Sequence, residues 1–216
     1  VWMMLLAYMK ENKKKFSSMQ RTVIGGSAAP RSMIETFEKE YNVHVIHAWG
    51  MTEMSPVGTV CSMKKKHKNI SFDEQIKLQL KQGRAVYGVD MKIVDGNGKD
   101  LPWDGKAFGN LLVRGPWITS GYFKGEGGQV VDGQGWFDTG DVATIDTDGY
   151  MQITDRSKDV IKSGGEWISS IDVENSAVGC PGIAEAAVIA VPHPKWDERP
   201  LLVAVKMKDA RVTKEG

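Results

Sequence analysis

Apolar positions recur with helical spacing and then in strand-like runs over the first 60 residues. The stretch 2–11 has apolar residues at positions 2, 5, 6 and 9 and predicts a helix. A strand near 21–25, a helix over 31–41 and a β-branched strand over 43–49 follow it. Alternating helices and strands are typical of α/β proteins with a parallel sheet, so the segment 1–60 is predicted to be the end of an α/β layer.

The period changes to two from residue 84 onward. The run "VYGVDMKIVD" alternates, "DGNG" (95–98) marks a turn, and "TDG" (147–149) is an Asp-Gly hairpin signal. These strands and turns predict an antiparallel barrel or sandwich over 61–154. The polar interlude before them contains "KKKHK" (64–68). We interpret it as a solvated surface loop rather than a phosphate site, because no aromatic or glycine-rich partner accompanies the lysines.

The last part of the chain changes pattern again. "KDVIKSGGEWIS" (158–169) predicts two short strands around a glycine turn. Ser170 is the predicted cap of a short helix that ends at Gly179. Two further strands are predicted from "AEAAVIAVP" and "LLVAVKM". We therefore expect an incomplete small α+β domain over 155–216, with the boundary at Asp155.

Composition and charge narrow the class of protein. The 216 residues are 41% hydrophobic and 25% charged, with a formal net charge of +1. This is ordinary for a soluble globular protein and gives no electrostatic reason to expect nucleic acid as a partner. Cys61 and Cys180 form no CxxC pair, which argues against a disulfide scaffold or a zinc site and favours a reducing, cytoplasmic setting. No apolar run reaches the roughly 18 residues of a membrane-spanning helix.

Both ends of the sequence lie inside patterned stretches. Val1 opens a helical pattern, and "KDARVTKEG" ends the chain without a closing element. We therefore expect the sequence to be an internal piece of a longer protein.

A first candidate site is "HAWGMTEMSP" (47–56), which leaves the end of a predicted strand, where α/β proteins place ligand sites. Trp49 offers a π face for a purine, and Gly50 lets the backbone come close to a ligand. Thr52 has a hydroxyl donor for a phosphate oxygen, and Glu53 is a hard oxygen ligand suited to Mg²⁺. The alternative is an ordinary loop with a core tryptophan.

Two later stretches carry further candidates. In "GWFDTGD" (135–141), the Asp141 carboxylate can accept hydrogen bonds from both hydroxyls of a ribose, and the alternative is a β-turn in which it bonds its own backbone. In "DRSKDVIKSGGEWIS" (155–169), Arg156 can bind a ribose or a phosphate. The Gly-Gly turn at 164–165 lets a thin ligand pass the backbone. The alternative for this second stretch is a basic hairpin with a tight turn.

The glycine-rich turn "GGSAA" (25–29) has two interpretations. It comes near the G-x-S-x-G nucleophile elbow of hydrolases, in which Ser27, Asp141 and His193 would form the triad. Ala29 replaces the last glycine of that motif, and the predicted antiparallel block does not continue a hydrolase sheet. We therefore favour the second interpretation, a flat backbone wall that seats a ligand.

Four ordered blocks together resemble the adenylate-forming, or AMP-binding, superfamily, in the form found in medium- and long-chain fatty acyl-CoA ligases. They are "WGMTEMSP", "GWFDTGD", "DRSKDVIKSGGEWIS" and "EAAVIAVPHPKWDERP". The resemblance covers essentially the whole chain. It implies the C-terminal part of a large α/β plus β-barrel domain, followed by part of a small α+β domain. It also implies an AMP-forming acid–thiol ligase that uses ATP, Mg²⁺ and coenzyme A on a small carboxylic acid.

The resemblance also implies roles for the matching residues. The turn at 27–29 faces one side of adenine and Trp49 the other, Thr52 contacts the α-phosphate, and Asp141 contacts the ribose. Thr52 and Glu53 are the implied catalytic residues, with Glu53 as the Mg²⁺ ligand. The implied nucleotide-binding residues are Ser27, Ala28, Ala29, Trp49, Gly50, Met51, Thr52, Asp141 and Arg156.

The remaining implied roles concern the acyl group, CoA and the domain movement. Gly25 and Gly26 border the acyl tunnel. A hinge at Asp155 lets the small domain turn after the first half-reaction. The residues that then meet CoA are Gly164, Gly165 and Glu166.

Two parts of the family pattern have no match in this sequence: the loop that wraps the β- and γ-phosphates and the lysine that stabilises the adenylation transition state. We expect both to lie outside residues 1–216, so the chain alone is predicted to show little ATP–pyrophosphate exchange. The alternatives to a CoA ligase are an adenylation domain that loads a carrier protein and a non-catalytic homologue that binds nucleotide or acyl-CoA.

Overall fold

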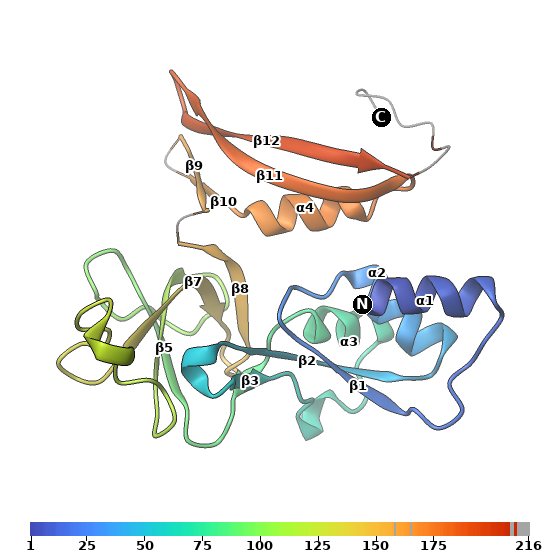
Figure 1. Cartoon of the computed structure of the whole chain (residues 1–216), viewed down its shortest axis with the longest axis horizontal. Coiled ribbons are helices and arrows are strands. Elements are labelled where there is room, and N and C mark those ends of the chain that lie inside the picture. Colours follow the sequence, from blue (N-terminus) through green and yellow to red (C-terminus); the bar gives the residue numbers. More distant parts are fainter. Residues whose placement is uncertain (158, 165, 208–209, 211–216) are drawn as a thin grey trace.

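The computed structural model describes residues 1–157, 159–164, 166–207 and 210, and this part of the chain forms three four-stranded sheets. Figure 1 shows two of the sheets with their helices in the lower half of the view, and a smaller unit of β9–β12 with α4 above them. Strand β8 leads from the lower part into the smaller unit (Figure 1).

The first sheet combines parallel and antiparallel pairing in the order β1-β2-β3-β4. Its strands are β1 (Arg21–Ile24), β2 (His44–Gly50), β3 (Val57–Val60) and β4 (Arg84–Ala85). Strands β1 and β2 are parallel, with Thr22 opposite Val45, which confirms the predicted parallel pair. Strands β3 and β4 continue the sheet in antiparallel pairing.

Three helices pack with this sheet: α1 (Trp2–Glu11), α2 (Arg31–Glu35) and α3 (Phe72–Gln79). The helix predicted over 31–41 is α-helical only to Glu35 and continues as a π-helical turn over Thr36–Glu40. One core joins these helices to β1 and β2; it consists of Leu6, Ile24, Ala29, Met33, Ile34, Phe37, Val43, Val45 and Ile76. Over the residues that the structure describes, no helix is long and apolar enough to cross a membrane.

Helix α3 lies in the stretch that the sequence analysis interpreted as a polar interlude. A capping box begins it: the Ser71 hydroxyl accepts a hydrogen bond from the Glu74 backbone N–H (3.3 Å), and the Glu74 carboxylate accepts one from the Ser71 N–H (2.9 Å). Its Ile76 is fully buried in the first core. The first sheet therefore extends to Ala85 and its core to Leu80, past the boundary predicted at residue 60. The division of the chain into three segments stays a prediction.

The second sheet is an antiparallel meander in the order β5-β6-β7-β8. Its strands are β5 (Asp90–Val94), β6 (Phe108–Arg114), β7 (Phe137–Ile145) and β8 (Met151–Arg156). Burial alternates along β6, as the period of two predicts. The buried residues of this sheet form a second core with Met54, which comes from the loop after β2.

The second sheet is the predicted antiparallel block, and over the described residues it is open rather than a closed barrel. Within the described part of the chain, the edge strands β5 and β8 do not pair with each other. The start of β8 pairs instead with Gly83, because Gly83 and Met151 exchange backbone hydrogen bonds of 3.3 and 2.7 Å. Gly83 has a φ of +97°, and a Cβ there would lie 2.2 Å from the Val60 carbonyl carbon, so only glycine fits between the two sheets.

The smaller unit consists of a four-stranded antiparallel sheet and one helix. Its elements are β9 (Ile161–Ser163), β10 (Glu166–Ile168), α4 (Ser170–Val178), β11 (Ile183–His193) and β12 (Asp197–Lys206). The predicted short hairpin, the helix end before Gly179 and the two long strands are confirmed. The predicted helix cap is wrong by one residue: Ser169 accepts the hydrogen bond from the Asp172 N–H, and Ser170 is the first helical residue.

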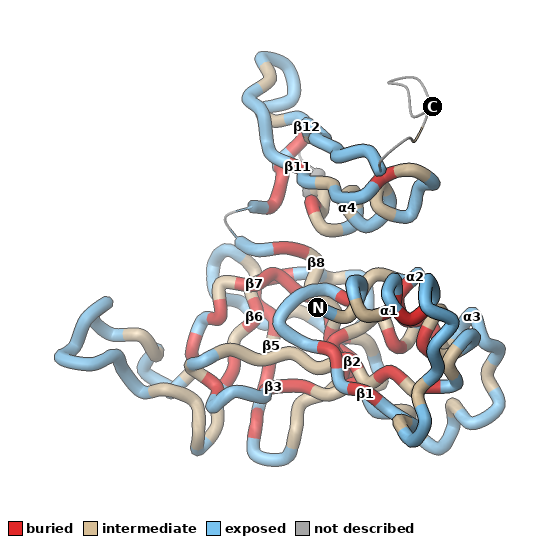
Figure 2. The backbone as a smooth tube through the Cα atoms, turned by 45° about the vertical axis from the view of Figure 1, so that its right-hand side comes forward, coloured by how far each residue is buried: buried red, intermediate tan, exposed pale blue. Residues whose placement is uncertain are grey.

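Helix α4 lies between the β11–β12 hairpin and the rest of the molecule (Figure 1). Most of this unit is exposed, whereas the first and second sheets carry most of the buried positions (Figure 2). The small unit is therefore held to the rest by β8 and α4 more than by a large shared core.

The basic stretch 64–68 is anchored rather than freely solvated. Lys64 and Lys66 both pair with Asp148, at 3.3 and 2.6 Å, in the predicted Asp-Gly turn at 147–149. Asp148 therefore holds two of the four lysines of this stretch, and its interpretation as a surface loop rather than a phosphate site stays a prediction.

We expect Ile76→Ala to lower the free energy of unfolding by about 2–5 kcal/mol, because it leaves a cavity in the first core. Urea unfolding followed by circular dichroism measures this change. Lys77→Ala on the same helix is the control, because its pair with Asp73 is exposed to solvent and contributes little to stability. Equal midpoints for the two variants would contradict the inclusion of α3 in this core.

Candidate active site

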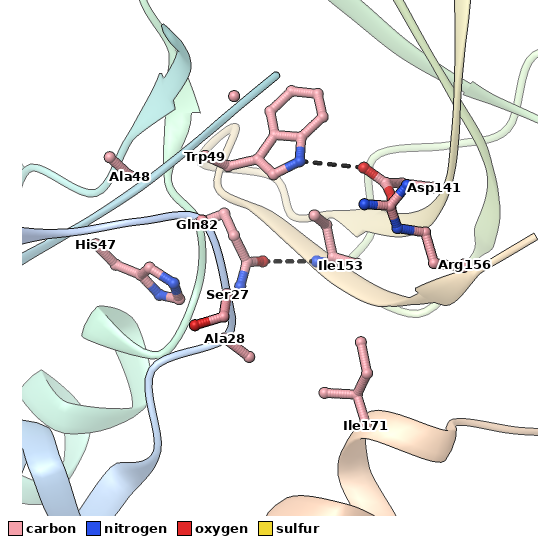
Figure 3. Close-up of a pocket in the computed structure, with 12 residues that line it drawn as sticks. Ser27, Ala28, His47, Ala48, Trp49, Gln82, Asp141, Ile153, Arg156 and Ile171 are labelled. Atoms are coloured by element: carbon pink, nitrogen blue, oxygen red, sulfur yellow. Dashed lines mark hydrogen bonds and ion pairs between the residues drawn. The ribbon is translucent and has the colours of Figure 1, made fainter. Parts of the chain in front are cut away.

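A cleft opens where the carboxyl ends of β1 and β2 meet strands β7 and β8 and the start of α4. Figure 3 shows Trp49 at one side, Ser27 and Ala28 across from it, and Asp141 with Arg156 at one end. The predicted site residues that line it are Gly26, Ser27, Ala28, Trp49, Gly50, Asp141 and Arg156. The structure therefore brings together side chains that lie up to 130 positions apart in the sequence.

Asp141 is the centre of the charged end of this cleft. Its Oδ2 accepts a hydrogen bond from the Trp49 indole N–H at 3.1 Å, and its Oδ1 pairs with the Arg156 Nε at 2.9 Å. Strand pairing fixes the second contact, because Asp141 on β7 lies opposite Arg156 on β8. Asp141 is 3% exposed, whereas the Arg156 side chain is 58% exposed.

Burial raises the pKa of Asp141 above its ordinary value of 3.8, and the charge of Arg156 and the Trp49 hydrogen bond oppose that rise. Two donors thus hold the carboxylate in place without fully compensating its burial. A ligand hydroxyl at this position would add a further donor to a carboxylate that has few.

The turn between β1 and α2 forms the wall across from Trp49. Gly25 lies so close to β2 that a Cβ there would be 3.0 Å from the Ala48 carbonyl oxygen, and Gly26 has a φ of +83°. The turn therefore presents Ser27 and Ala28 to the cleft through backbone constraints. Ala29 is 2% exposed and lines an adjacent cavity beside α4 rather than the cleft itself.

The hydrolase interpretation of Ser27 finds no support in this arrangement. Asp141 contacts Trp49 and Arg156 instead of a histidine, and His193 lies at the end of β11 in the small unit. The described residues contain no Ser–His–Asp chain of hydrogen bonds.

Thr52 and Glu53 belong to a single 3₁₀ turn (Thr52–Met54) that follows β2, and neither lines the cleft, whose lining on this strand ends at Gly50. Thr52 is exposed and Glu53 is half-buried. Glu53 Oε1 accepts a hydrogen bond from the Tyr122 hydroxyl at 2.8 Å, and its Oε2 accepts none from any residue that the structure describes. Met51, which precedes this turn, packs against the second core.

Glu53 alone has too few oxygen atoms to bind Mg²⁺, so it fits the ion only when a bound ligand supplies further oxygen atoms. No group of three or more His, Cys, Asp or Glu suited to a metal ion occurs in the described part of the chain. Mg²⁺ is usually bound through one or two carboxylates together with substrate phosphates and water. Glu53, with one carboxylate oxygen that no described donor contacts, fits the protein's part of such a site.

Gly50 is required by the loop after β2, and its role toward a ligand stays a prediction. A Cβ at Gly50 would lie 1.8 Å from the Pro56 carbonyl oxygen, which accepts a hydrogen bond from the Met51 N–H at 2.9 Å. The loop after β2 folds back on itself at this point, so the missing side chain is required for the loop to close.

The cleft also contains residues that the sequence analysis did not single out. His47 and Gln82 are both buried, and each contacts the Leu80 carbonyl oxygen. The Gln82 side-chain carbonyl accepts a hydrogen bond from the Ile153 N–H at 2.7 Å (Figure 3). His47 occupies an inward position of the predicted strand 43–49, which was a usable signal, whereas Gln82 has no local pattern that marks it.

The predicted hinge residue Asp155 ties β8 to helix α4. It is 1% exposed, and its Oδ2 accepts a hydrogen bond from the Ser170 N–H at 2.7 Å while Oδ1 accepts one from the Ser170 hydroxyl at 3.0 Å. Asp172, in the same helical turn, has a raised pKa because of burial and the charge of Asp155. The N-terminus of α4 thus provides two donors to a buried carboxylate of β8, and the Arg156 N–H adds a third at 2.8 Å.

The predicted CoA loop lies in the small unit, at the turn between β9 and β10. Gly164 has a φ of +62° and lies under Trp196, where a Cβ would be 2.5 Å from the indole ring. Gly165 lies outside the described residues. The backbone of Glu166 begins β10. Gly164 does not line the cleft around Asp141.

Comparison with known proteins identifies the family. Residues 1–123 match the AMP-binding enzyme family, and residues 172–215 match the AMP-binding enzyme C-terminal domain. The chain belongs to the AMP-binding enzyme family. This membership confirms the resemblance on which the predicted site residues rest, while the role of each residue stays a prediction.

Relatives in this family include CoA ligases. The chain is 57% identical over 206 residues to a 3-methylmercaptopropionyl-CoA ligase of Ruegeria lacuscaerulensis and 53% identical over 213 residues to a medium-chain-fatty-acid–CoA ligase of Ectopseudomonas oleovorans. These alignments cover 95% and 99% of the chain but 38% and 39% of the relatives. The chain therefore spans less than half the length of the relatives it matches.

Solved structures of AMP-binding enzymes share the fold. The chain matches an o-succinylbenzoate CoA synthetase from Bacillus subtilis in complex with its acyl-adenylate intermediate, with a TM-score of 0.78, 26% identity and coverage of 96% of this chain and 41% of that one. An amide bond synthetase from Marinactinospora thermotolerans gives a TM-score of 0.81 at 28% identity, over 98% of this chain and 41% of that one. The predicted fold class of an adenylate-forming enzyme is therefore confirmed.

The raised pKa of Asp141 predicts a pH-dependent effect on stability. An ionised Asp141 costs more in the folded than in the unfolded state, so this cost is fully present at neutral pH and disappears as the pH falls through the raised pKa toward 3.8. We expect Asp141→Asn to have a higher Tm than the unsubstituted chain at pH 7, and the difference to shrink near pH 4. Asp90→Asn, in an exposed Asp–Arg pair, should change little at either pH. A lower Tm for Asp141→Asn at pH 7 would contradict the assignment.

Ser170→Ala should lower the free energy of unfolding by about 1 kcal/mol, because the buried Asp155 Oδ1 loses one of its two donors and keeps only the Arg156 backbone N–H. Urea unfolding measures the change. Ser176→Ala removes a serine hydroxyl from an exposed part of the same helix and serves as the control. If both variants unfold at the same urea concentration, the Ser170 hydroxyl does not stabilise the junction between β8 and α4.

Proposed function

We propose that this chain forms the nucleotide-binding part of an ATP-dependent acyl-CoA ligase, which activates a small carboxylic acid as acyl-AMP and transfers the acyl group to CoA. The observation that carries the proposal is the buried Asp141, held by Trp49 and Arg156 at one end of a cleft whose opposite wall is a flat turn. The names of the relatives, which are CoA ligases, support the same reaction.

In this proposal, adenosine occupies the cleft. The purine lies between the indole of Trp49 and the turn at Ser27 and Ala28, where a flat ring gains the dispersion and stacking energy of an aromatic contact. The ribose hydroxyls donate hydrogen bonds to Asp141, and Arg156 contacts the same sugar. The α-phosphate then points toward the turn after β2, where the Thr52 hydroxyl donates to a phosphate oxygen.

Mg²⁺ is proposed to bind at Glu53 together with the phosphates of ATP. When bound, the ion supplies positive charge that offsets the repulsion between two anionic reactants. The residues of this chain orient the nucleotide: Glu53 provides an oxygen ligand on one side of the phosphates, and Asp141 fixes the ribose on the other.

The proposed first step is attack of the substrate carboxylate oxygen on the α-phosphorus of ATP. A bond forms between that oxygen and the α-phosphorus, the bond from the α-phosphorus to the oxygen that bridges it to the β-phosphorus breaks, and pyrophosphate leaves. In the second step the thiolate of CoA attacks the acyl carbon and AMP leaves with the bonding electron pair. Gly25 and Gly26 are proposed to border the acyl group, since their missing side chains leave room beside the turn.

The second half-reaction is proposed to need the small unit. Its β9–β10 turn, with Gly164, Gly165 and Glu166, would meet CoA after the unit turns about Asp155. The relatives' names, which include medium-chain and long-chain fatty-acid–CoA ligases, support a carboxylic acid as the substrate. A cytoplasmic setting is part of the proposal.

The test is binding of AMP to the purified chain, measured by isothermal titration calorimetry and by quenching of tryptophan fluorescence. We expect Asp141→Ala to weaken AMP binding by about 10- to 100-fold, since it removes a charge-assisted hydrogen bond to the ribose. Trp49→Leu should weaken binding and also remove most of the quenching.

Trp103→Leu is the control for the tryptophan change, because Trp103 is partly exposed and packs beside Gly149, away from the cleft. It should leave both the affinity and the quenching unchanged. Unaltered AMP affinity in Asp141→Ala would remove the proposed nucleotide site.

A further inference from the structure

The segment after β6 folds back onto the turn that carries Glu53. The Thr119 N–H donates to the Glu53 backbone carbonyl at 2.8 Å, and the Ser55 hydroxyl donates to the Trp117 carbonyl at 3.2 Å. The side chains of Trp117 and Ile118 pack against the core that contains the buried Met54. The Thr52–Met54 turn is therefore anchored by the burial of Met54 in the second core and by hydrogen bonds to residues 117–119.

Tyr122 completes this contact at the side chain of Glu53. Its hydroxyl donates to Glu53 Oε1 at 2.8 Å across 69 positions of sequence. The segment between the backbone contact and this one is itself fixed, because the Thr119 hydroxyl donates to the Gly121 carbonyl at 2.9 Å. Tyr122 is 43% exposed, so packing alone does not set its position.

This hydrogen bond orients the Glu53 carboxylate and leaves most of its acceptor sites available. A carboxylate has about four lone-pair sites, of which the Tyr122 hydroxyl takes one on Oε1. Glu53 Oε2 stays free of donors from the described residues. A cation that demands near-ideal octahedral geometry gains most from a ligand whose direction is fixed before it binds.

We propose that Tyr122 is a positioning residue: its hydroxyl fixes the Glu53 carboxylate so that Oε2 receives the divalent cation that accompanies the nucleotide. The inference rests on the proposed function, in which Glu53 binds the cation of an ATP complex, and it extends the site to a segment beyond the cleft. Partners that orient a metal ligand typically change metal affinity by about 10- to 100-fold when removed.

The test compares ATP binding to the purified chain in the presence of Mg²⁺ and in the presence of EDTA. Tyr122→Phe keeps the ring and removes the hydroxyl. We expect it to lose about 10-fold of the Mg²⁺-dependent gain in ATP affinity, while its AMP affinity and its Tm stay unchanged. Tyr87→Phe, which removes a hydroxyl from a side chain that is 98% exposed, should retain the full gain.

A double-mutant cycle separates positioning from a general structural effect. Glu53→Gln should abolish the Mg²⁺-dependent gain, and adding Tyr122→Phe to it should cause no further loss. A full gain in Tyr122→Phe, or a further loss in the double variant, would overturn the proposal. An unsubstituted chain whose ATP affinity ignores Mg²⁺ would overturn it too, while AMP binding that depends on Asp141 would leave the nucleotide site standing. Absence of AMP binding to the unsubstituted chain would remove the proposed function itself.

Discussion

The structure around the cleft depends on keeping one buried carboxylate in place. Asp141 belongs to β7, and its two oxygens contact Trp49 of β2 and Arg156 of β8. A buried carboxylate is unfavourable unless donors surround it, so these contacts constrain the first sheet relative to the second. The same requirement supports function: a carboxylate that burial keeps short of donors gains more from two ligand hydroxyls than one that water already solvates.

Strand β8 extends this constraint to the small unit, because adjacent residues on a strand point to opposite faces. Arg156 faces the cleft and pairs with Asp141, while Asp155 faces away and accepts both hydrogen bonds of Ser170. The dipeptide Asp155–Arg156 therefore connects the cleft on one side with helix α4 on the other. If the small unit rotated about this point, Asp155 would have to replace the hydrogen bonds from Ser170 with others. Because the carboxylate is buried, that replacement is costly.

The sequence predicted the elements that a pattern of neighbouring residues marks. It missed residues whose place depends on contacts with distant parts of the chain, and one helix whose pattern is masked by its composition. Alternation marked β6, the Asp-Gly turn marked the hairpin before β8, and the motif order marked Trp49 and Asp141 as members of one site. Helix α3 was missed although "SFDE" is a capping box, because lysine and glutamine dominate the surrounding composition. Gln82 could not be found at all: it belongs to the cleft only because Ile153, 71 residues later, donates to it.

Two glycines of the predicted site are required by contacts within the chain, while their role toward a ligand stays a prediction. The sequence analysis gave Gly50 and the turn at 164–165 the same role, close approach of a ligand to the backbone. In the structure, Gly50 is required by the Pro56 carbonyl and Gly164 by the Trp196 ring. Both are contacts within the chain, so a side chain at either position would first disturb the loop that presents the site. A glycine in a family motif can thus be essential for binding through the shape of its loop, without touching the ligand.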